Sequence, residues 1–486
     1  MTTKSLPDKK TKIVCTIGPA SRSPQVLKDL ILAGMNIARI NFAHADAGIH
    51  RESIRLIRAA AAETGQRVAI MGDLPGPKMR IGEVVPEPTF LERDQPFILE
   101  SGEFIGNAQH ASMKFDGLAK AVKAGDRIFI NDGLIKLAVE KVTGNEVHTR
   151  VLIGGELRSN KGVNFPGIDL GISAFTENDR QWLAFAAAEG IDAVSQSFVD
   201  NAGDITVLRE AAAELNYEPF IIAKIERAGA LQHMEEILAA TDGIMVARGD
   251  LGVEIPIQQI AVVQKDLITQ ANLLGKPVIT ATHMLESMTY NTRPTRAEAT
   301  DVANAILDGT DCVMLSGETA VGEYPVDAVE VMAGIARETE PYCNGHKVAD
   351  RLQAQHKSGE PDSDVLISAS IFATTRTYDT VAVVAPTLSG RTARMISRFR
   401  LPVWIIAISP QESTCQELQF SYGVYAVYQQ FRPTNWEKFA RDWLAEHNLH
   451  GKLALLTQGS GTGVTGYSNR IGFIDLTQPM SEIITW

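Results

Sequence analysis

The sequence has few cysteines, few aromatic residues and no long apolar run. Its four cysteines are Cys15, Cys312, Cys343 and Cys415, and no two of them form a Cys-x-x-Cys pair. A zinc site or a disulfide framework is therefore not expected, and a reducing cytoplasm fits this usage. The N-terminal stretch MTTKSLPDKKTK lacks the apolar core of a signal peptide. No run of about 18 apolar residues exists, so no membrane-spanning helix is expected.

The chain also has fewer basic than acidic residues. Lys and Arg number 46 against 58 for Asp and Glu, which gives a formal net charge of −12. This balance argues against a nucleic-acid surface and leaves small anionic substrates possible wherever cations gather locally. Apolar residues make up 45% of the chain, which is enough for sizeable cores. The length of 486 residues predicts two to four domains.

Short apolar runs recur along the chain, and a helix-like segment usually follows each of them. Eight such runs end on polar residues: TKIVCTIG from Thr11, NIARINFA from Asn36, VAIMGDLP from Val68, DAVSQSFV from Asp192, FIIAKIE from Phe220, GIMVARGD from Gly243, PVITATH from Pro277 and CVMLSGE from Cys312. Near-continuous apolar strands that alternate with helices indicate a parallel sheet covered on both faces. Eight such units predict an α/β fold of the (β/α)8 TIM-barrel type.

This rhythm breaks once, between residues 83 and 166. Stretches such as DRIFIND and LIKLAVEKV alternate apolar and polar residues, and NDG and TGNE supply turns, so a small β-rich insertion is predicted after the third barrel strand. After the polar stretch HKSGEPDSD a new α/β pattern begins, with DTVAVVAP, PVWIIAIS, YGVYAVY and KLALLTQG. We therefore predict a barrel domain from 1–82 and 167–342, a β-rich domain from 83–166 and a C-terminal α/β domain from 343–486.

In a TIM barrel the active site lies at the carboxyl ends of the strands. The polar residues expected at this rim are Arg39, Asn41, Asp73, Ser197, Lys224, Glu226, Arg248, Asp250, Thr282, Ser316 and Glu318. Any one of them, taken alone, is best explained as a solvated strand end. Together on one face they bring like and unlike charges close to one another, and such a cluster needs a ligand or a metal ion.

Two short motifs suggest what that ligand is. In AKIER, Lys224 and Glu226 point to the same side of one strand, and VARGDLG places Asp250 on the next. Two carboxylates with open positions suit Mg²⁺, although a simple salt bridge between Lys224 and Glu226 is an alternative. Arg39 suits a phosphoryl group, and Lys224 suits negative charge that develops during a reaction. With the Thr282 hydroxyl, these groups suggest phosphoryl transfer, or enolate chemistry on a small acid.

Long segments of the chain also resemble one family. They are TKIVCTIGPAS, GMNIARINFAHA, KGVNFPG, AKIERAGAL, DGIMVARGDLGVEIP, GKPVITATHMLESM, RPTRAEATDVANAILDGTD and MLSGETAVGEYP. On these nearly contiguous segments the chain resembles the pyruvate kinases over almost its whole length. The resemblance implies a barrel, a small β-barrel lid that closes over the site and a C-terminal regulatory domain. It also implies transfer of a phosphoryl group from phosphoenolpyruvate to ADP, giving pyruvate and ATP in the final step of glycolysis, with Mg²⁺ or Mn²⁺ as cofactor.

The resemblance assigns roles to residues of the rim. It implies that Lys224 stabilises the transition state and the enolate, that Arg39 binds the transferring phosphoryl group, and that Glu226 and Asp250 hold the divalent cation. Thr282 would lie on the route that protonates the enolate and would help to bind the substrate carboxylate. The backbone groups implied for that carboxylate region belong to Arg248, Gly249 and Asp250. The positions implied for the nucleotide are Asn41, His44, Arg80 and Lys161, the last brought in as the lid closes.

One departure from the family pattern concerns a monovalent cation. The family's usual potassium site uses an Asn, a Ser, an Asp and a Thr; Asn41 and Asp73 match, but Ala43 and Leu74 lack the hydroxyl. In GDLPGPKMRIG, Lys78 stands where potassium-dependent members carry Glu. Because a compact ammonium supplies the charge that potassium would have supplied, we predict activity without potassium. The alternative is that Lys78 is an exposed turn lysine and that another residue completes a monovalent site.

The C-terminal domain carries a Ser-Gly turn before a helix, in PTLSGRTAR. This composition is typical of a phosphate-binding nest, and the corresponding loop of the family binds a phosphorylated allosteric effector. The candidate residues are Thr387, Ser389, Gly390, Arg391 and Thr392. The alternative is an ordinary helix start capped by Ser389. A second glycine-rich turn, GSGTGVTGYSN at 459–469, would close over the loop, and the family resemblance also implies a homotetramer. Two lesser departures, His283 and Asp200, receive no role.

Two other functions remain open from the residues. One is another magnesium-dependent barrel that acts on phosphoenolpyruvate or a keto acid, such as an aldolase or lyase, which would need no ADP. The insertion and the KGVN segment with Lys161 favour a nucleotide instead. The other is a catalytically inactive binding protein kept for its C-terminal domain, which the intact set of Lys224, Glu226, Asp250 and Thr282 argues against.

Overall fold

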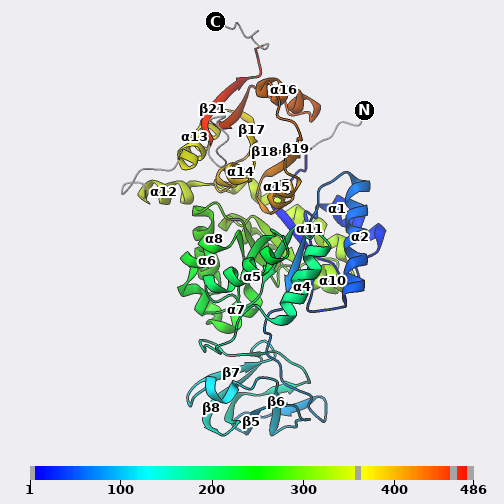
Figure 1. The fold of residues 1–486 in the computed structure, drawn as a ribbon, viewed down its shortest axis with the longest axis vertical. Helices are drawn as coiled ribbons and strands as arrows, with labels where there is room; N and C mark the ends of the chain where they lie inside the picture. The colour runs from blue at the N-terminus through cyan, green and yellow to red at the C-terminus, as the bar shows by residue number, and fades with distance from the viewer. Residues whose placement is uncertain (1–5, 356–362, 460–467, 479–486) are drawn as a thin grey trace.

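The computed structural model describes residues 6–355, 363–459 and 468–478, and it shows three lobes stacked along the longest axis of the molecule (Figure 1). The middle lobe is the barrel, the β-rich insertion lies at one end of it and the C-terminal α/β lobe at the other. Part of the glycine-rich turn at 459–469 falls outside the described residues. In the described part of the chain, no helix combines the length and the apolarity that crossing a membrane requires.

Eight parallel strands close into a barrel, and each coincides with one of the eight apolar runs. They are β1 (Lys12–Thr16), β2 (Ile37–Asn41), β3 (Ala69–Leu74), β12 (Ala193–Gln196), β13 (Phe220–Ile225), β14 (Gly243–Ala247), β15 (Val278–Ala281) and β16 (Cys312–Leu315). Their order around the barrel is β1-β16-β15-β14-β13-β12-β3-β2. The predicted TIM-barrel fold is thereby confirmed.

Helices cover the outside of this barrel. They are α1 (Pro24–Ala33), α2 (Ala47–Thr64), α4 (Glu177–Ala188), α5 (Ala202–Glu214), α6 (Met234–Ala240), α7 (Arg248–Glu254), α8 (Ile260–Leu273), α9 (Arg296–Asp308), α10 (Gly317–Ala320) and α11 (Pro325–Thr339). Capping boxes start α4, α5 and α9 at Thr176, Asn201 and Thr295, because each side chain accepts a backbone N–H of the first turn. Gly309 ends α9 at a φ of +98°, which few other residues tolerate.

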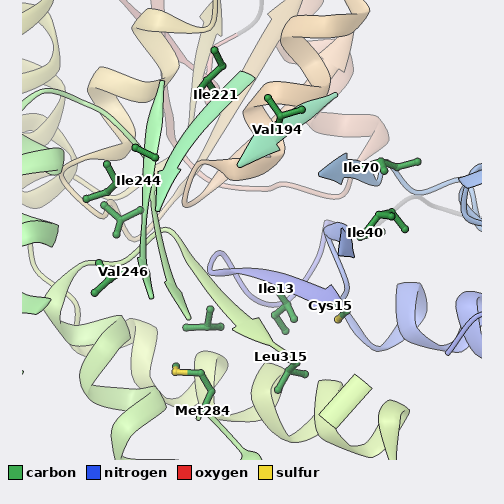
Figure 2. Packing of buried hydrophobic residues seen from close by; sticks show 14 of the residues in the cluster. Ile13, Cys15, Ile40, Ile70, Val194, Ile221, Ile244, Val246, Met284 and Leu315 are labelled. Carbon is green, nitrogen blue, oxygen red and sulfur yellow. The ribbon is translucent and has the colours of Figure 1, made fainter. Parts of the chain in front are cut away.

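Side chains alternate between the two faces of the barrel strands. The outward set, including Ile13, Ile70 and Ile221, packs against the helices (Figure 2). The inward set is mostly apolar toward the start of the strands, with Ile37 on β2 and Phe220 and Ile222 on β13, although β1 begins there with Lys12. Because side chains alternate with a period of two, the inward series continues along β2 to Arg39 and Asn41 and along β13 to Lys224 and Glu226. The barrel interior therefore changes from apolar to charged toward its carboxyl end.

The insertion after β3 consists of strands with one short helix. Its strands are β4 (Thr89–Leu91), β5 (Pro96–Ser101), β6 (His110–Met113), β7 (Arg127–Ile130), β8 (Ile135–Thr143), β9 (Glu146–Ile153), β10 (Gly155–Leu157) and β11 (Val163–Asn164), and its helix is α3 (Leu118–Ala121). They form a six-stranded sheet, β11-β7-β8-β9-β5-β6, and a two-stranded sheet, β10-β4, around one shared apolar core, where a small β-barrel was expected. Two connectors join this lobe to the barrel and pair with each other, with Arg80 opposite Gly162 and the Ile81 N–H donating to the Lys161 carbonyl at 3.0 Å.

The C-terminal lobe is a mostly parallel sheet with helices. Its strands are β17 (Thr380–Pro386), β18 (Trp404–Ser409), β19 (Val424–Tyr428), β20 (Leu453–Gly459) and β21 (Ser468–Asp475), and its helices are α12 (His346–Gln355), α13 (Ser363–Thr377), α14 (Arg391–Ser397), α15 (Glu412–Glu417) and α16 (Trp436–Glu446). The sheet order is β19-β18-β17-β20-β21, and β21 is antiparallel to β20. Strands β17 to β20 match the predicted runs, whereas β21 was not predicted.

This lobe closes the amino end of the barrel interior. Phe420, in the turn before β19, belongs to the apolar cluster inside the barrel and stacks on Phe220 with ring centroids 5.4 Å apart. The buried Lys12 ammonium donates to the Val424 carbonyl at 2.7 Å. Arg400 forms a buried ion pair with Asp311 at 2.8 Å. The barrel and the C-terminal lobe therefore share a packed and charged interface.

Candidate active site

Arg39 and Asp73 form a buried ion pair on neighbouring strands at the carboxyl end of the barrel. The Arg39 Nε donates to Asp73 Oδ2 at 2.9 Å, and Nη2 contacts the same oxygen. The third guanidinium nitrogen, Nη1, donates to the Thr16 hydroxyl at 2.8 Å. Burial alone would raise the pKa of Asp73, but the charges of Lys224 and Arg39 outweigh it and lower that pKa to about 2. Asp73 is therefore ionised and fixes the orientation of Arg39.

Lys224 lies at the centre of the cluster. Its Nζ donates to the Ser197 hydroxyl at 2.7 Å, pairs with Glu226 Oε1 at 2.9 Å and lies 3.4 Å from Asp73 Oδ1. Burial would lower the pKa of Lys224, but the carboxylates of Asp73 and Glu226 outweigh burial and raise it above its ordinary value. The side chain is thus a permanent cation held by three oxygen atoms.

Glu226 and Asp250 are the two carboxylates expected to bind a divalent cation. Burial raises the pKa of Glu226; the Lys224 charge opposes this effect, and the negative charge of Asp250 adds to it. The two carboxylates follow the neighbouring strands β13 and β14, and the charge of Asp250 is felt at Glu226. Glu226 is buried, and its Oε2 accepts the Phe198 N–H at 2.8 Å, while the Asp250 side chain is partly exposed. Hard oxygen donors with one solvent-facing side fit Mg²⁺ or Mn²⁺.

Thr282 follows β15 in a left-handed backbone conformation, with a φ of +64°, and His283 after it has a φ of +52°. Such angles are costly for a β-branched residue and are retained where surrounding contacts enforce them. The Thr282 hydroxyl accepts the Gly249 N–H at 2.8 Å, which joins the end of β15 to the start of α7. The predicted neighbours Thr282 and Gly249 are thus in direct contact, and His283 lies exposed beside them.

The Arg248 side chain turns away from this cluster. Its guanidinium pairs with Asp301 at 2.7 Å and donates to the Thr282 carbonyl at 2.8 Å. The side chain is thus not available to a ligand, and the prediction for this segment concerns only the backbone groups of residues 248–250. Glu318, also expected at the rim, is buried and accepts the N–H groups of Leu285 and Ser316. We therefore interpret Glu318 as a residue that fixes loops at the rim.

The four residues expected to contact a nucleotide occupy two places. Asn41 and His44 lie at the end of β2 and in the turn after it, where the Asn41 Oδ1 accepts the Ala43 N–H at 3.1 Å and His44 is exposed. Arg80 and Lys161 lie on the paired connectors to the β-rich lobe, where Arg80 Nη1 donates to the Asn160 carbonyl at 2.9 Å.

Lys78 lies on the first connector and contacts Asp250, with Nζ 3.6 Å from Oδ1. The family pattern predicts Lys78 beside Asn41 and Asp73 instead. The Asp73 oxygens are engaged elsewhere, since Oδ2 binds Arg39 and Oδ1 accepts the Ser195 hydroxyl at 2.7 Å. The Lys78 ammonium instead contacts Asp250, whose side chain retains an exposed side.

The Ser-Gly turn of the C-terminal lobe connects β17 to α14. Ser389 is exposed, and the Arg394 Nη2 donates to its carbonyl at 2.7 Å. Gly390 has a φ of +75°, and Arg391 pairs with Asp364 of α13 at 2.8 Å. Thr387 is half-buried and Thr392 is buried. Thr387, Ser389 and Gly390 lie on this loop, and Arg391 and Thr392 begin α14.

Sequence reasoning missed two neutral side chains of the site. Ser195 and Thr16 are hydroxyl residues inside apolar runs, and they hold Asp73 and Arg39 respectively. The signal that could have found Ser195 is its position on the inward face of β12, two residues before Ser197. Asp301, which fixes Arg248, was also missed, because it lies on helix α9 and the prediction considered only residues at strand ends.

Comparison with known proteins agrees with this geometry. The family profile described as pyruvate kinase, barrel domain, matches residues 8–329, and that described as pyruvate kinase, alpha/beta domain, matches residues 366–472. Pyruvate kinase of Thermococcus litoralis is 46% identical over 422 residues, covering 86% of this chain and 89% of the relative. Pyruvate kinase of Geobacillus stearothermophilus is 44% identical over 471 residues, covering 95% and 79%. Pyruvate kinase 2 of Synechocystis is 41% identical over 479 residues, covering 97% and 80%. The chain belongs to the pyruvate kinase family.

Proposed function

We propose that this chain is a pyruvate kinase that transfers the phosphoryl group of phosphoenolpyruvate to ADP in the final step of glycolysis. The observation that carries the proposal is the fixed charge cluster at the carboxyl rim. There the ammonium of Lys224 lies between the ion pair of Arg39 with Asp73 and the carboxylates of Glu226 and Asp250. Two oriented cations beside two hard carboxylates suit the transfer of an anionic phosphoryl group.

In this proposal Arg39 and Lys224 neutralise charge on the transferring group. In phosphoryl transfer the protein contributes mainly by positioning the reactants and by stabilising the charge of the transition state. Asp73 keeps the Arg39 fork oriented, and the raised pKa of Lys224 keeps its ammonium charged across the working pH range. A divalent cation held by Glu226 and Asp250 would supply Lewis-acid stabilisation of substrate oxygens. When the phosphoryl group leaves, the enolate oxygen faces the Lys224 ammonium.

The substrate carboxylate and the proton route are assigned to the segment from Arg248 to Asp250 and to Thr282. Backbone N–H groups at the start of α7 would bind the carboxylate, because the Arg248 side chain is fixed elsewhere by Asp301. The strained backbone at Thr282 holds its hydroxyl toward Gly249. We assign to this hydroxyl a place on the route that delivers a proton to the enolate carbon, giving pyruvate.

The β-rich lobe is proposed as a lid over the nucleotide. Arg80 and Lys161 lie on its two connectors, so that closure of a lid formed by residues 83–166 would carry both toward the barrel rim. Asn41 and His44 would face the nucleotide from the barrel side. Closing lids exclude water and complete a catalytic site, which suits transfer to ADP rather than to water.

A coupled assay tests the activity. Purified protein is given phosphoenolpyruvate, ADP and Mg²⁺, and pyruvate is followed through lactate dehydrogenase, with Lys224→Met as the inactive control. Pyruvate that appears only with ADP, and is lost with the variant, is the expected result. Pyruvate released without ADP would support a phosphoenolpyruvate lyase or phosphatase instead, and no pyruvate from folded protein would support a binding role.

We further propose that the enzyme needs no potassium. Side-chain oxygens are lacking at Ala43 and Leu74, and the Asp73 oxygens are engaged by Arg39, Ser195 and Lys224. Lys78 brings a covalently attached cation to the same rim. A bound potassium ion would therefore find few free ligands and an existing positive charge.

Activity in potassium compared with activity in tetramethylammonium, at equal ionic strength, tests this proposal. The unaltered chain should be equally active in both salts. Lys78→Glu should lower activity in tetramethylammonium. The triple variant that also carries Ala43→Ser and Leu74→Thr should regain activity in potassium but not in tetramethylammonium. Strong potassium activation of the unaltered chain would refute the proposal.

Regulation and assembly are also proposed from the family. A phosphorylated effector would bind the β17–α14 loop at Thr387, Ser389, Gly390, Arg391 and Thr392, and the chain would form a homotetramer. Sugar phosphates and nucleoside monophosphates can be screened for a change in the phosphoenolpyruvate saturation curve, with Ser389→Asp as the variant that repels phosphate. Light scattering measures the assembly, and a monomer at working concentration would contradict it.

A further inference from the structure

Each proposed metal ligand is paired with a lysine in this structure. Lys224 lies 2.9 Å from Glu226, and Lys78 lies 3.6 Å from Asp250. Two carboxylates that repel one another are thus neutralised by two ammonium groups. A divalent cation held by Glu226 and Asp250 would bring the same amount of positive charge, and it would compete with the two ammonium groups for these carboxylates.

The two lysines are held very differently. Lys224 is buried and has three oxygen partners within 3.4 Å. The Lys78 side chain is 39% exposed, and within the described residues its ammonium contacts only Asp250. Withdrawing Lys224 would leave Glu226 buried without its counter-ion and would leave Asp73 with Arg39 alone, whereas withdrawing Lys78 returns an ammonium to water at little cost.

We propose that Lys78 is a tethered counter-ion that competes with the divalent cation for Asp250 and thereby sets the affinity of the metal site. This inference rests on the proposed function, in which Glu226 and Asp250 are the metal ligands. Lys78 acts through Asp250, so it is a positioning residue for the metal site. Once displaced, its ammonium remains at the rim as the proposed substitute for the charge of potassium.

The position of Lys78 links this competition to the lid. Lys78 lies on the first connector, two residues before Arg80, which pairs with Gly162 on the returning connector. A Cβ placed on Gly162 would lie 3.3 Å from the Lys78 Cε, so the lysine stem passes close over the second connector. Movement of the Lys78 side chain away from Asp250 therefore changes contacts on both connectors.

A direct binding measurement tests the competition. Mn²⁺ is titrated into the protein without substrates at low ionic strength, and free Mn²⁺ is followed by electron paramagnetic resonance. Lys78→Gln should bind Mn²⁺ about two- to fivefold more tightly than the unaltered chain, the range expected for an exposed ion pair. The gain should shrink as salt is added, since screening weakens the contact that the metal must break.

The matched control is Arg80→Gln. It removes one positive charge from the same connector, but the Arg80 guanidinium donates to the Asn160 carbonyl rather than to a carboxylate. Its Mn²⁺ affinity should stay close to that of the unaltered chain. An equal gain in Mn²⁺ affinity in both variants would mean that the positive charge of the connector repels the metal ion in general, and it would overturn the inference. Unchanged or weaker Mn²⁺ binding by Lys78→Gln would also overturn it.

Asp250→Asn separates failure of this inference from failure of the proposed site. The variant should bind Mn²⁺ much more weakly, and Lys78→Gln should have no further effect in its background. If Asp250→Asn does not weaken binding, the assignment of the metal site is wrong. If it does weaken binding while Lys78→Gln alone changes nothing, the site stands and the competition is refuted.

Discussion

Lys12 offers a test of the interface that closes the barrel. It starts β1 on the inward face, is 4% exposed and donates to the Val424 carbonyl of the C-terminal lobe at 2.7 Å. Its ammonium also lies 5.6 Å from the centre of the Trp404 ring. Burial, followed by the nearby charge of Lys9, lowers the pKa of Lys12 from 10.5 to about 7, although Cys312, Glu340 and Asp311 oppose this change. The perturbation is Lys12→Met, which keeps the apolar stem and removes the charge.

The magnitude follows from the two pKa values. Each tenfold change in proton affinity corresponds to about 1.4 kcal/mol, so the difference between 10.5 and about 7 corresponds to about 5 kcal/mol of unfavourable burial. The variant also deprives the Val424 carbonyl of its donor, which costs about 1–3 kcal/mol. At neutral pH we therefore expect a net gain of about 2–4 kcal/mol in the free energy of unfolding.

The sign of the pH dependence is fixed by which state carries the proton. Between about pH 7 and 10.5 the unfolded chain holds a proton on Lys12 that the folded chain has released, so the stability of the unaltered protein rises with pH through this group. Below about pH 7 both states are protonated and the full penalty remains. The advantage of Lys12→Met should therefore be greatest below about pH 7 and should fall by about 2–3 kcal/mol by about pH 9.

Thermal unfolding by calorimetry at about pH 6.5 and about pH 9 measures this difference. Lys123→Met, which alters an exposed lysine of the β-rich lobe, is the matched control and should shift both midpoints equally. An advantage of Lys12→Met that is the same at both pH values, or that grows as pH rises, would refute the reasoning.

Three further outcomes are expected. Lys224→Met should lower kcat about 10²–10³-fold with folding intact by circular dichroism, because one preorganised cation is lost; a loss below tenfold in the coupled assay would contradict its role. Phe420→Ala should cost about 3–5 kcal/mol in urea unfolding, because its ring fills the barrel end against Phe220; a cost under 1 kcal/mol would mean that the end of the barrel rearranges. Arg400→Met should cost about 3–5 kcal/mol, because Asp311 stays buried without its partner; unchanged chemical denaturation would argue against that pairing.

The barrel was predictable because its strands carry a strong local signal. All eight apolar runs became strands, since a strand buried on both faces needs near-continuous apolar residues. Strand β21 was missed because it is an antiparallel edge strand that begins next to a glycine-rich turn, and SNRIGFID lacks such a run. The β-rich lobe was recognised as β-structure, but its division into two sheets depends on pairings between distant segments, such as β5 with β9.

The charged part of the site was predictable from alternation along single strands. Lys224 and Glu226 share a face because they are two residues apart, and the structure pairs them. The pairing of Arg39 with Asp73 was not predictable, because it depends on the stagger of β2 against β3, in which Arg39 lies opposite Met71. The contact between Lys78 and Asp250 depends on the path of a connector through prolines, and no periodicity describes that path.

The aromatic seal at the amino end of the barrel has a consequence for how the chain is made. Phe420 follows its hydrogen-bond partner Cys312 by 108 residues, so every barrel strand has left the ribosome well before the residue that plugs the interior. During that interval Phe220, Ile222 and Met245 lack Phe420, which completes their apolar cluster inside the barrel. A later part of the same polypeptide therefore completes the barrel, and a chain truncated between the two lobes would lack the ring that packs on Phe220.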